Sequence, residues 1–140
     1  MTSTLAGGPN RVLLDSSVTI AFLEIGDALH IRARAALERH AGAQMLVSVL
    51  TYAETLVRPM AYGGSVLETV EGFMREAIHR IEPVTPAIAR RAAGMRATHG
   101  GLRLVDALIV ATGEELAADR IVTADARWAS ASDRVELLVG

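Results

Sequence analysis

The chain has 140 residues, with 14 arginines against 16 acidic residues and neither lysine nor cysteine. A hydrophobic content of 51% with 21% charged residues excludes intrinsic disorder as the main state, and the length is that of one domain. The missing residue types exclude disulfide scaffolds, thiolate zinc sites, cysteine nucleophiles, P-loops and Schiff-base chemistry. The net charge of -2 argues against a protein that coats nucleic acid through a broadly basic surface, but not against an enzyme that binds a few phosphates.

The amino-terminal segment and the hydropathy pattern bear on location. No apolar run approaches the roughly 20 residues that a membrane-spanning helix needs, and residues 1–10 lack the pattern of a secretory signal. We therefore expect a soluble, cytoplasmic protein that does not engage a membrane. Small residues and a Gly-Gly-Pro break predict a flexible tail at residues 1–10, followed by a single domain at residues 11–139.

Short apolar runs alternate with longer segments of helical periodicity. In chain order, the sequence predicts strand 11–15, helix 16–24, helix 28–41, strand 44–48, helix 50–60, helix 65–78, strand 80–84, helix 87–98, helix 104–118, strand 120–124 and strand 135–139. Strands of this length between helices are typical of a parallel sheet covered on both faces. The predicted fold is α/β, a three-layer α/β/α sandwich with a central parallel sheet of about five strands.

Four acidic residues interrupt apolar segments, where a solvated surface does not explain them. They are Asp15 at the end of RVLLD, Glu54 within LTYAETLV, Asp106 within RLVDALIVAT and Asp125 after IVTA. Three have an ordinary explanation: Asp15 as a helix cap, Asp106 as a partner of the helix dipole, and Asp125 as a turn residue. Glu54 is harder to explain, because an unpaired carboxylate on an apolar helix face is costly.

Taken together, the four acids predict a metal site. The carboxyl ends of parallel strands line one edge of a sheet, and ligands bind there at the point where the strand order reverses. Because clustered carboxylates repel each other, a hard divalent cation such as Mg²⁺ or Mn²⁺ is needed to hold them. Acidic sites that hold two such ions about 3.5–4 Å apart are suited to phosphoryl chemistry.

The segments that carry these acids resemble those of PIN-domain ribonucleases, and within them the VapC-type toxins of bacterial toxin–antitoxin pairs. LLDSSVTIAFL, SVLTYAETL and LRLVDALIVATGEELAADRIVTAD are similar to the family's successive motif blocks, and the resemblance covers residues 11–139. It implies a PIN-like fold and Mg²⁺- or Mn²⁺-dependent endoribonuclease activity. Trp128 stands where many members carry Phe, and we expect it to have a packing role.

The resemblance also implies roles for the four acids. Asp15 and Asp106 would be the main metal ligands. Glu54 and Asp125 would complete the acidic catalytic pocket, either directly or through water.

Hydroxyl and basic residues near the acids are further candidates. By the same resemblance, Ser16, Ser17 and Thr123 would be supporting hydroxyls that orient a carboxylate or a water. Helix capping and turn hydrogen bonds explain Ser16 and Ser17 equally well. Arg96 and Arg103 flank a Gly-Gly turn and are candidates to contact RNA phosphates at the rim of the site. The alternative is that they are ordinary solvated arginines.

The resemblance implies three partners: an RNA substrate, a second copy in a homodimer, and a VapB-like antitoxin. The C-terminal segment of such an antitoxin lies over the active-site groove and often places an arginine among the acids. The toxin would arrest translation and growth. Two alternatives stay open: a housekeeping PIN ribonuclease in RNA processing, and a catalytically idle PIN-like module that binds RNA or protein. Phospho-acceptor domains are disfavoured, because receivers need a lysine and dehalogenase-type phosphatases need an Asp where Ser17 stands.

Overall fold

The computed structural model describes residues 10–138. In chain order its elements are β1 (Arg11–Leu14), α2 (Ser16–Leu23), α3 (His30–Arg39), β2 (Gln44–Ser48), α4 (Val49–Tyr62), α5 (Gly64–Glu76), β3 (Arg80–Glu82), α6 (Pro86–Thr98), α7 (Leu104–Glu115), β4 (Arg120–Thr123), the 3-10 helix η1 (Ala126–Ser130) and β5 (Val135–Leu137). Each predicted strand and helix is present, and η1 is the element that the sequence pattern did not predict.

The ends of the predicted elements differ by a few residues from those observed. The helix predicted to reach residue 118 ends at Glu115, because Ala117 adopts a left-handed backbone conformation with φ of 53°. The predicted tail at 1–10 lies outside the described residues except for Asn10, and so does position 139 of the last predicted strand. Within the described residues, every helix is too short or too polar to span a membrane.

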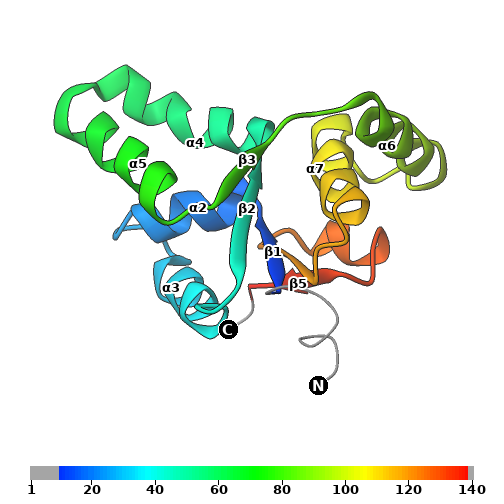
Figure 1. Ribbon diagram of the computed structural model, residues 1–140, viewed down its shortest axis with the longest axis horizontal. Helices are drawn as coiled ribbons and strands as arrows, with labels where there is room; N and C mark the ends of the chain where they lie inside the picture. Colours follow the sequence, from blue (N-terminus) through cyan, green and yellow to red (C-terminus); the bar gives the residue numbers. More distant parts are fainter. Residues whose placement is uncertain (1–9, 139–140) are drawn as a thin grey trace.

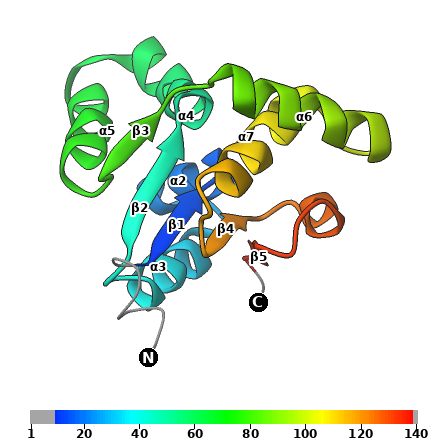
Figure 2. The same cartoon turned by 45° about the vertical axis from the view of Figure 1, so that its right-hand side comes forward.

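The strands form one five-stranded sheet in the order β3-β2-β1-β4-β5 (Figures 1 and 2). Every neighbouring pair is parallel; in the centre, Leu13 of β1 pairs with Leu46 of β2 on one side and with Ile121 of β4 on the other. The chain proceeds from β1 outward through β2 to β3 and then returns to β4 on the other side of β1. The strand order therefore reverses between β1 and β4, where a parallel α/β sheet binds its ligands.

Alternating side chains of the strands enter two separate cores. Val12 and Leu14 of β1 pack with residues of α2, α3 and α5, whereas Leu13 packs with residues of α6 and α7. Figure 1 shows these two groups of helices on opposite sides of the strands. The predicted three-layer α/β/α sandwich with a five-stranded parallel sheet is confirmed.

Helix α7 packs tightly against β4 and carries one of the candidate acids. Its apolar residues are buried on most sides, and Gly113 faces Ile121 of β4 so closely that a Cβ at this position would lie 2.4 Å from the Ile121 Cδ1. Trp128 of η1 is buried in the same core, which agrees with the packing role expected for it. The closeness of α7 to β4 fixes where the first turn of the helix, and Asp106, stands over the sheet.

Candidate active site

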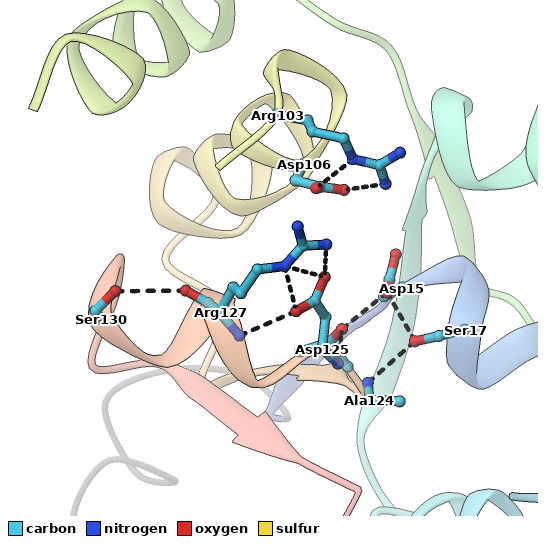
Figure 3. Close-up of polar contacts among 9 residues, drawn as sticks. Asp15, Ser17, Arg103, Asp106, Ala124, Asp125, Arg127 and Ser130 are labelled. Carbon is cyan, nitrogen blue, oxygen red and sulfur yellow. Dashed lines mark hydrogen bonds and ion pairs between the residues drawn. The ribbon is translucent and has the colours of Figure 1, made fainter. Parts of the chain in front are cut away.

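Asp15 follows β1 at the point where the strand order reverses. It occupies the N-cap position of α2, but its carboxylate makes no capping hydrogen bond to the first turn of that helix. Instead, its Oδ2 accepts hydrogen bonds from Ser17 Oγ at 2.7 Å and from Thr123 Oγ1 at 2.8 Å (Figure 3). Of the two explanations considered for Ser17, the geometry therefore favours the one in which its hydroxyl orients a carboxylate.

The same hydroxyls connect the ends of β1 and β4. Ser17 Oγ accepts a hydrogen bond from the Ala124 N–H at 3.0 Å, and Thr123 Oγ1 accepts one from the Asp125 N–H at 3.1 Å. Each hydroxyl thus donates its proton to Asp15 and accepts from the backbone of the loop that follows β4. The position of the Asp15 carboxylate is determined by both strands of the switch point.

The electrostatic state of Asp15 follows from these surroundings. The residue is only 6% exposed, and this burial raises the pKa of its carboxyl group above the ordinary value. The hydrogen bonds from Ser17 and Thr123 lower that pKa but do not offset the burial, and the negative charge of Asp106 raises it further. Asp15 is therefore a buried anion that is well oriented but not neutralised.

Glu54 approaches the same place from α4, with its side chain open to solvent. Partial burial raises the pKa of its carboxyl group, and the charges of Asp15 and Asp106 add to this effect, while a hydrogen bond with the Ser16 side chain opposes it. The helix face that it shares with Val57 is not a core face, because Val57 is 66% exposed. Glu54 is thus less buried than the sequence pattern implied, and its burial cost is correspondingly smaller.

Asp106 lies in the first turn of α7 and is 5% exposed. Its carboxylate accepts two hydrogen bonds from Arg103, to Oδ2 from Nε at 3.0 Å and to Oδ1 from Nη2 at 3.3 Å. The ion pair raises the pKa of the Arg103 guanidinium, first through the hydrogen bond and then through the charge. Arg103, predicted for the rim, therefore lies within the acidic site.

Arg96, the other predicted rim residue, has a different environment. Its Nη1 donates to the backbone carbonyl of Leu102 at 2.7 Å. This bond ties the turn between α6 and α7 and leaves Arg96 without a carboxylate partner among the described residues.

Asp125 follows β4 and begins η1. It accepts from Arg127 through the backbone N–H at 3.0 Å and through the side chain, with Nη2 at 2.6 Å from Oδ2 and Nε at 3.0 Å from Oδ1. These hydrogen bonds and the Arg127 charge hold the pKa of the Asp125 carboxyl group below its ordinary value, although burial opposes them. Sequence reasoning missed Arg127; the Asp-x-Arg spacing after a strand end is the signal that could have indicated it.

The structure brings the four predicted acids together at one edge of the sheet. Asp15 and Glu54 each feel the charge of Asp106, and Arg103 acts on both Glu54 and Asp125. Figure 3 shows the side chains of Asp15, Asp106 and Asp125 around a common space, with the Arg127 guanidinium between Asp106 and Asp125 and the Arg103 guanidinium on the far side of Asp106. Across residues 10–138, no three acidic or histidine side chains are already arranged to hold a metal ion. The carboxylate oxygens that a hard cation prefers are present, but arginines engage two of the four carboxylates, those of Asp106 and Asp125.

A groove lies beside this site. It has a volume of about 450 Å³, and α2, α4 and α5 line it with apolar side chains such as Ile20, Leu23 and Val66. Glu54 also lines it, so that the groove and the acidic site share a residue.

The model of the PIN domain family matches residues 12–133. The chain belongs to the PIN-domain family. The resemblance identified from the sequence is thereby confirmed.

Solved structures agree with this assignment. A toxin–antitoxin complex from Klebsiella pneumoniae has 25% identity and a TM-score of 0.72, over 91% of this chain and 98% of that one. VapC20 of Mycobacterium tuberculosis, a toxin that cleaves the sarcin-ricin loop, has 20% identity and a TM-score of 0.71, over 86% and 95%. FitAcB of Neisseria gonorrhoeae has 21% identity and a TM-score of 0.73, over 91% and 97%. No curated protein sequence matches the chain.

Proposed function

We propose that this protein is a divalent-metal-dependent endoribonuclease of the VapC type, acting as the toxin of a toxin–antitoxin pair. The observation that carries the proposal is the meeting of Asp15, Glu54, Asp106 and Asp125, from four separate segments, at the switch point of a PIN-domain sheet. The toxins among the similar structures support it, one of them described as an RNA-loop-cleaving toxin.

The donor chemistry of the site fits Mg²⁺ or Mn²⁺. All the candidate ligands are carboxylate oxygens, and sulfur or nitrogen ligands that would select a softer metal are not among them. Among the described residues, hydroxyl groups and no cation contact the Asp15 carboxylate, whose pKa is raised by burial and, to a smaller extent, by the charge of Asp106. A divalent ion bound there would supply activation of water and charge stabilisation at the leaving oxygen.

The residues of the chain would then have distinct tasks. Ser17 and Thr123 hold Asp15 in one orientation, so that little ordering is needed when a ligand arrives. Glu54 is reached by solvent and has a raised pKa, two properties that suit a group accepting a proton from water. Asp106 and Asp125 would complete the negative pocket once their arginine partners move away.

The partner proposed from the resemblance is a VapB-like antitoxin. We infer that an apolar segment of the antitoxin occupies the groove between α2, α4 and α5, because Glu54 makes the groove continuous with the acidic site. A segment there can cover the acids and inhibit cleavage. Exposed apolar side chains, including Ile31, Met60 and Tyr62, offer additional contact area for the antitoxin or for a second copy in a homodimer. The proposed location of the complex is the cytoplasm.

The nuclease activity is tested with purified protein and a fluorophore-labelled RNA in the presence of Mg²⁺ or Mn²⁺. We expect endonucleolytic cleavage that stops in EDTA and that falls by at least about 100-fold in Asp106→Asn, since a metal-dependent step is worth several kcal/mol. Glu38→Gln, a change of the same kind at an exposed acid of α3, is the control and should cleave normally. Cleavage that continues in EDTA would contradict the metal-dependent mechanism.

The toxin role needs a separate test in cells. Expression of the chain alone should arrest growth and translation, and co-expression of the small protein encoded beside it should relieve the arrest. Sequencing of RNA ends after induction, with Asp106→Asn as the inactive control, would identify the RNA that is cut. Harmless expression of an enzyme that cleaves RNA in vitro would favour the housekeeping alternative instead.

A further inference from the structure

Two arginines of the chain itself neutralise half of the acidic site. Arg103 engages both oxygens of Asp106, and Arg127 engages both oxygens of Asp125. The two guanidinium groups are close enough that Arg127 lowers the pKa of the Arg103 guanidinium, and Arg127 also feels the charge of Asp106. Both cations therefore face the same negative space (Figure 3).

Arg103 and Arg127 differ from other arginines of the structure, whose side chains donate hydrogen bonds to backbone carbonyls. Arg96 donates to the Leu102 carbonyl, and Arg134 donates to the Ala118 carbonyl, so that moving either side chain would release a backbone group. Among the described residues, the side chains of Arg103 and Arg127 bond to nothing but their carboxylates, and they are 70% and 56% exposed. Either side chain can therefore move into solvent without breaking a hydrogen bond other than those to its carboxylate.

The charges also match. Two guanidinium groups bring two positive charges to Asp106 and Asp125, and one divalent cation brings the same number. We propose that Arg103 and Arg127 are resident counterions that a divalent cation displaces from these carboxylates, and that the displaced guanidinium groups then bind the phosphates of the RNA. This inference rests on the proposed function, because it assigns to the site the metal and the substrate class proposed above.

The exchange couples metal binding to substrate binding. Without metal, the arginines are engaged by carboxylates and are poorly available to RNA. With metal, both are released at the rim, where a guanidinium can hold a phosphate through two parallel hydrogen bonds.

The test measures Mn²⁺ binding to the RNA-free protein by the loss of the free-ion EPR signal. In Arg103→Gln and in Arg127→Gln one of the two competing guanidinium groups is removed, and we expect the Kd for Mn²⁺ to fall by about five-fold in each, since an ion pair of this kind is worth up to about 1 kcal/mol. Arg103→Lys keeps the charge but loses the two-pronged geometry, and its Kd should lie between those of Arg103→Gln and the wild type.

A matched control separates local competition from the general effect of removing a positive charge. Arg75→Gln changes an exposed arginine of α5 by the same chemistry, and its Mn²⁺ Kd should stay within about two-fold of the wild type, because exposed charges at a distance are screened. Kd values for Arg103→Gln and Arg127→Gln that equal the wild-type value, or that rise, would overturn the inference.

The RNA arm uses steady-state cleavage at saturating Mn²⁺. Each Arg→Gln variant should raise KM for the RNA by several-fold while kcat is retained, because a phosphate contact is lost but the metal site is not. An unchanged KM would refute the second half of the exchange. If the wild type cleaves RNA but the wild type and the two Arg→Gln variants bind Mn²⁺ equally well, the counterion role is refuted and the proposed nuclease activity is not. If neither the wild type nor any variant binds Mn²⁺ or cleaves RNA, both the counterion role and the proposed nuclease activity are refuted.

Discussion

Asp15 and Asp106 are both buried carboxylates at the same edge of the sheet, but they are held by opposite means. Neutral hydroxyls of Ser17 and Thr123 hold Asp15, whereas the cation Arg103 holds Asp106. Hydroxyls orient a carboxylate without removing its charge, while a guanidinium neutralises it. The two sides of the site therefore differ in charge. On the β1 side, the negative charge of Asp15 has no cationic partner and attracts a cation. On the α7 side, the charge of Asp106 becomes available to a cation when Arg103 is displaced.

The largest expected effect comes from removing the uncompensated charge. Asp15→Asn should lower RNA cleavage by at least about 100-fold, because the site loses a ligand worth several kcal/mol in the transition state. The same variant should have a higher Tm than the wild type at neutral pH, since burial raises the pKa of Asp15 and its charge destabilises the folded state. An asparagine Oδ1 can still accept the two hydroxyl hydrogen bonds.

Asp106→Asn is the comparison that makes this prediction specific. It should lose cleavage to a similar extent but should not gain stability, because it leaves Arg103 without its ion-pair partner. Differential scanning calorimetry of both variants at one pH would compare them directly. A lower Tm for Asp15→Asn than for Asp106→Asn would contradict this difference between the two sides of the site.

The second prediction concerns a substitution that should displace α7, and with it Asp106, while leaving the β1 side of the site in place. Gly113→Ala would place a methyl group 2.4 Å from Ile121 Cδ1, in a core where Ile121 is fully buried. Overpacking of this kind costs about 1–3 kcal/mol, and it should push α7, and Asp106 with it, away from β4. We expect lower stability in chemical denaturation and weaker cleavage.

Gly94→Ala in α6 is the matched helical control. The exposed Gly94 has open space around its Cα, so that alanine there should stabilise the protein by about 0.5–1 kcal/mol through helix propensity. If the two substitutions had the same effect, the close approach of α7 to the sheet would not be what positions Asp106.

The fold was predictable because its signals are local. Apolar runs such as RVLL and RIVT are too short for buried helices and predict buried strands, and their alternation with helices favours a parallel sheet. The element η1 was missed because its five residues are too few for a periodic pattern, and because the Asp125 side chain that starts it reads equally well as a turn.

The site was predictable only as a set of residue types. The sequence indicates that Asp15, Glu54, Asp106 and Asp125 converge, because acids at strand ends and inside apolar helices need a reason to be there. It does not indicate that Arg103 pairs with Asp106 or that Arg127 pairs with Asp125, since an arginine near an acid is common on any solvated surface. Two features distinguish these pairs from arginines that bond to backbone carbonyls: the side chains are exposed, and they make no other hydrogen bonds among the described residues. Both features depend on the folded structure and cannot be inferred from the sequence.

The third prediction concerns metal binding and stability. A cation that binds the folded state raises the free energy of unfolding by about 1.4 kcal/mol at a free concentration ten times its Kd. Mn²⁺ should therefore raise the Tm of the wild type, and more so that of Arg103→Gln, in which no guanidinium competes for Asp106. It should not raise the Tm of Asp15→Asn. A uniform rise in all three proteins would indicate binding elsewhere.

The smallest effect is the pH dependence of stability, and here the two kinds of carboxylate should have opposite signs. Burial raises the pKa of folded Asp15 above the ordinary value of 3.8, so its contribution to stability is present below that pH and is lost as pH rises through the folded pKa. The hydrogen bonds of Arg127 lower the pKa of folded Asp125, so its contribution is present above 3.8 and is lost as pH falls through the folded pKa.

Urea unfolding of Asp15→Asn, Asp125→Asn and the wild type, at pH values from below 3.8 to neutrality, would distinguish the two opposite effects of pH on stability. Relative to the wild type, Asp15→Asn should become more stable as pH rises toward neutrality, and Asp125→Asn should become less stable. The Asp125 effect should be the smaller one, because Arg127 is largely exposed and water screens the pair. If the free energy of unfolding changed with pH in the same way in both variants, the two carboxylates would be held in electrostatically equivalent ways. That result would contradict the opposite signs expected here, because two hydroxyl groups contact Asp15 and a guanidinium contacts Asp125.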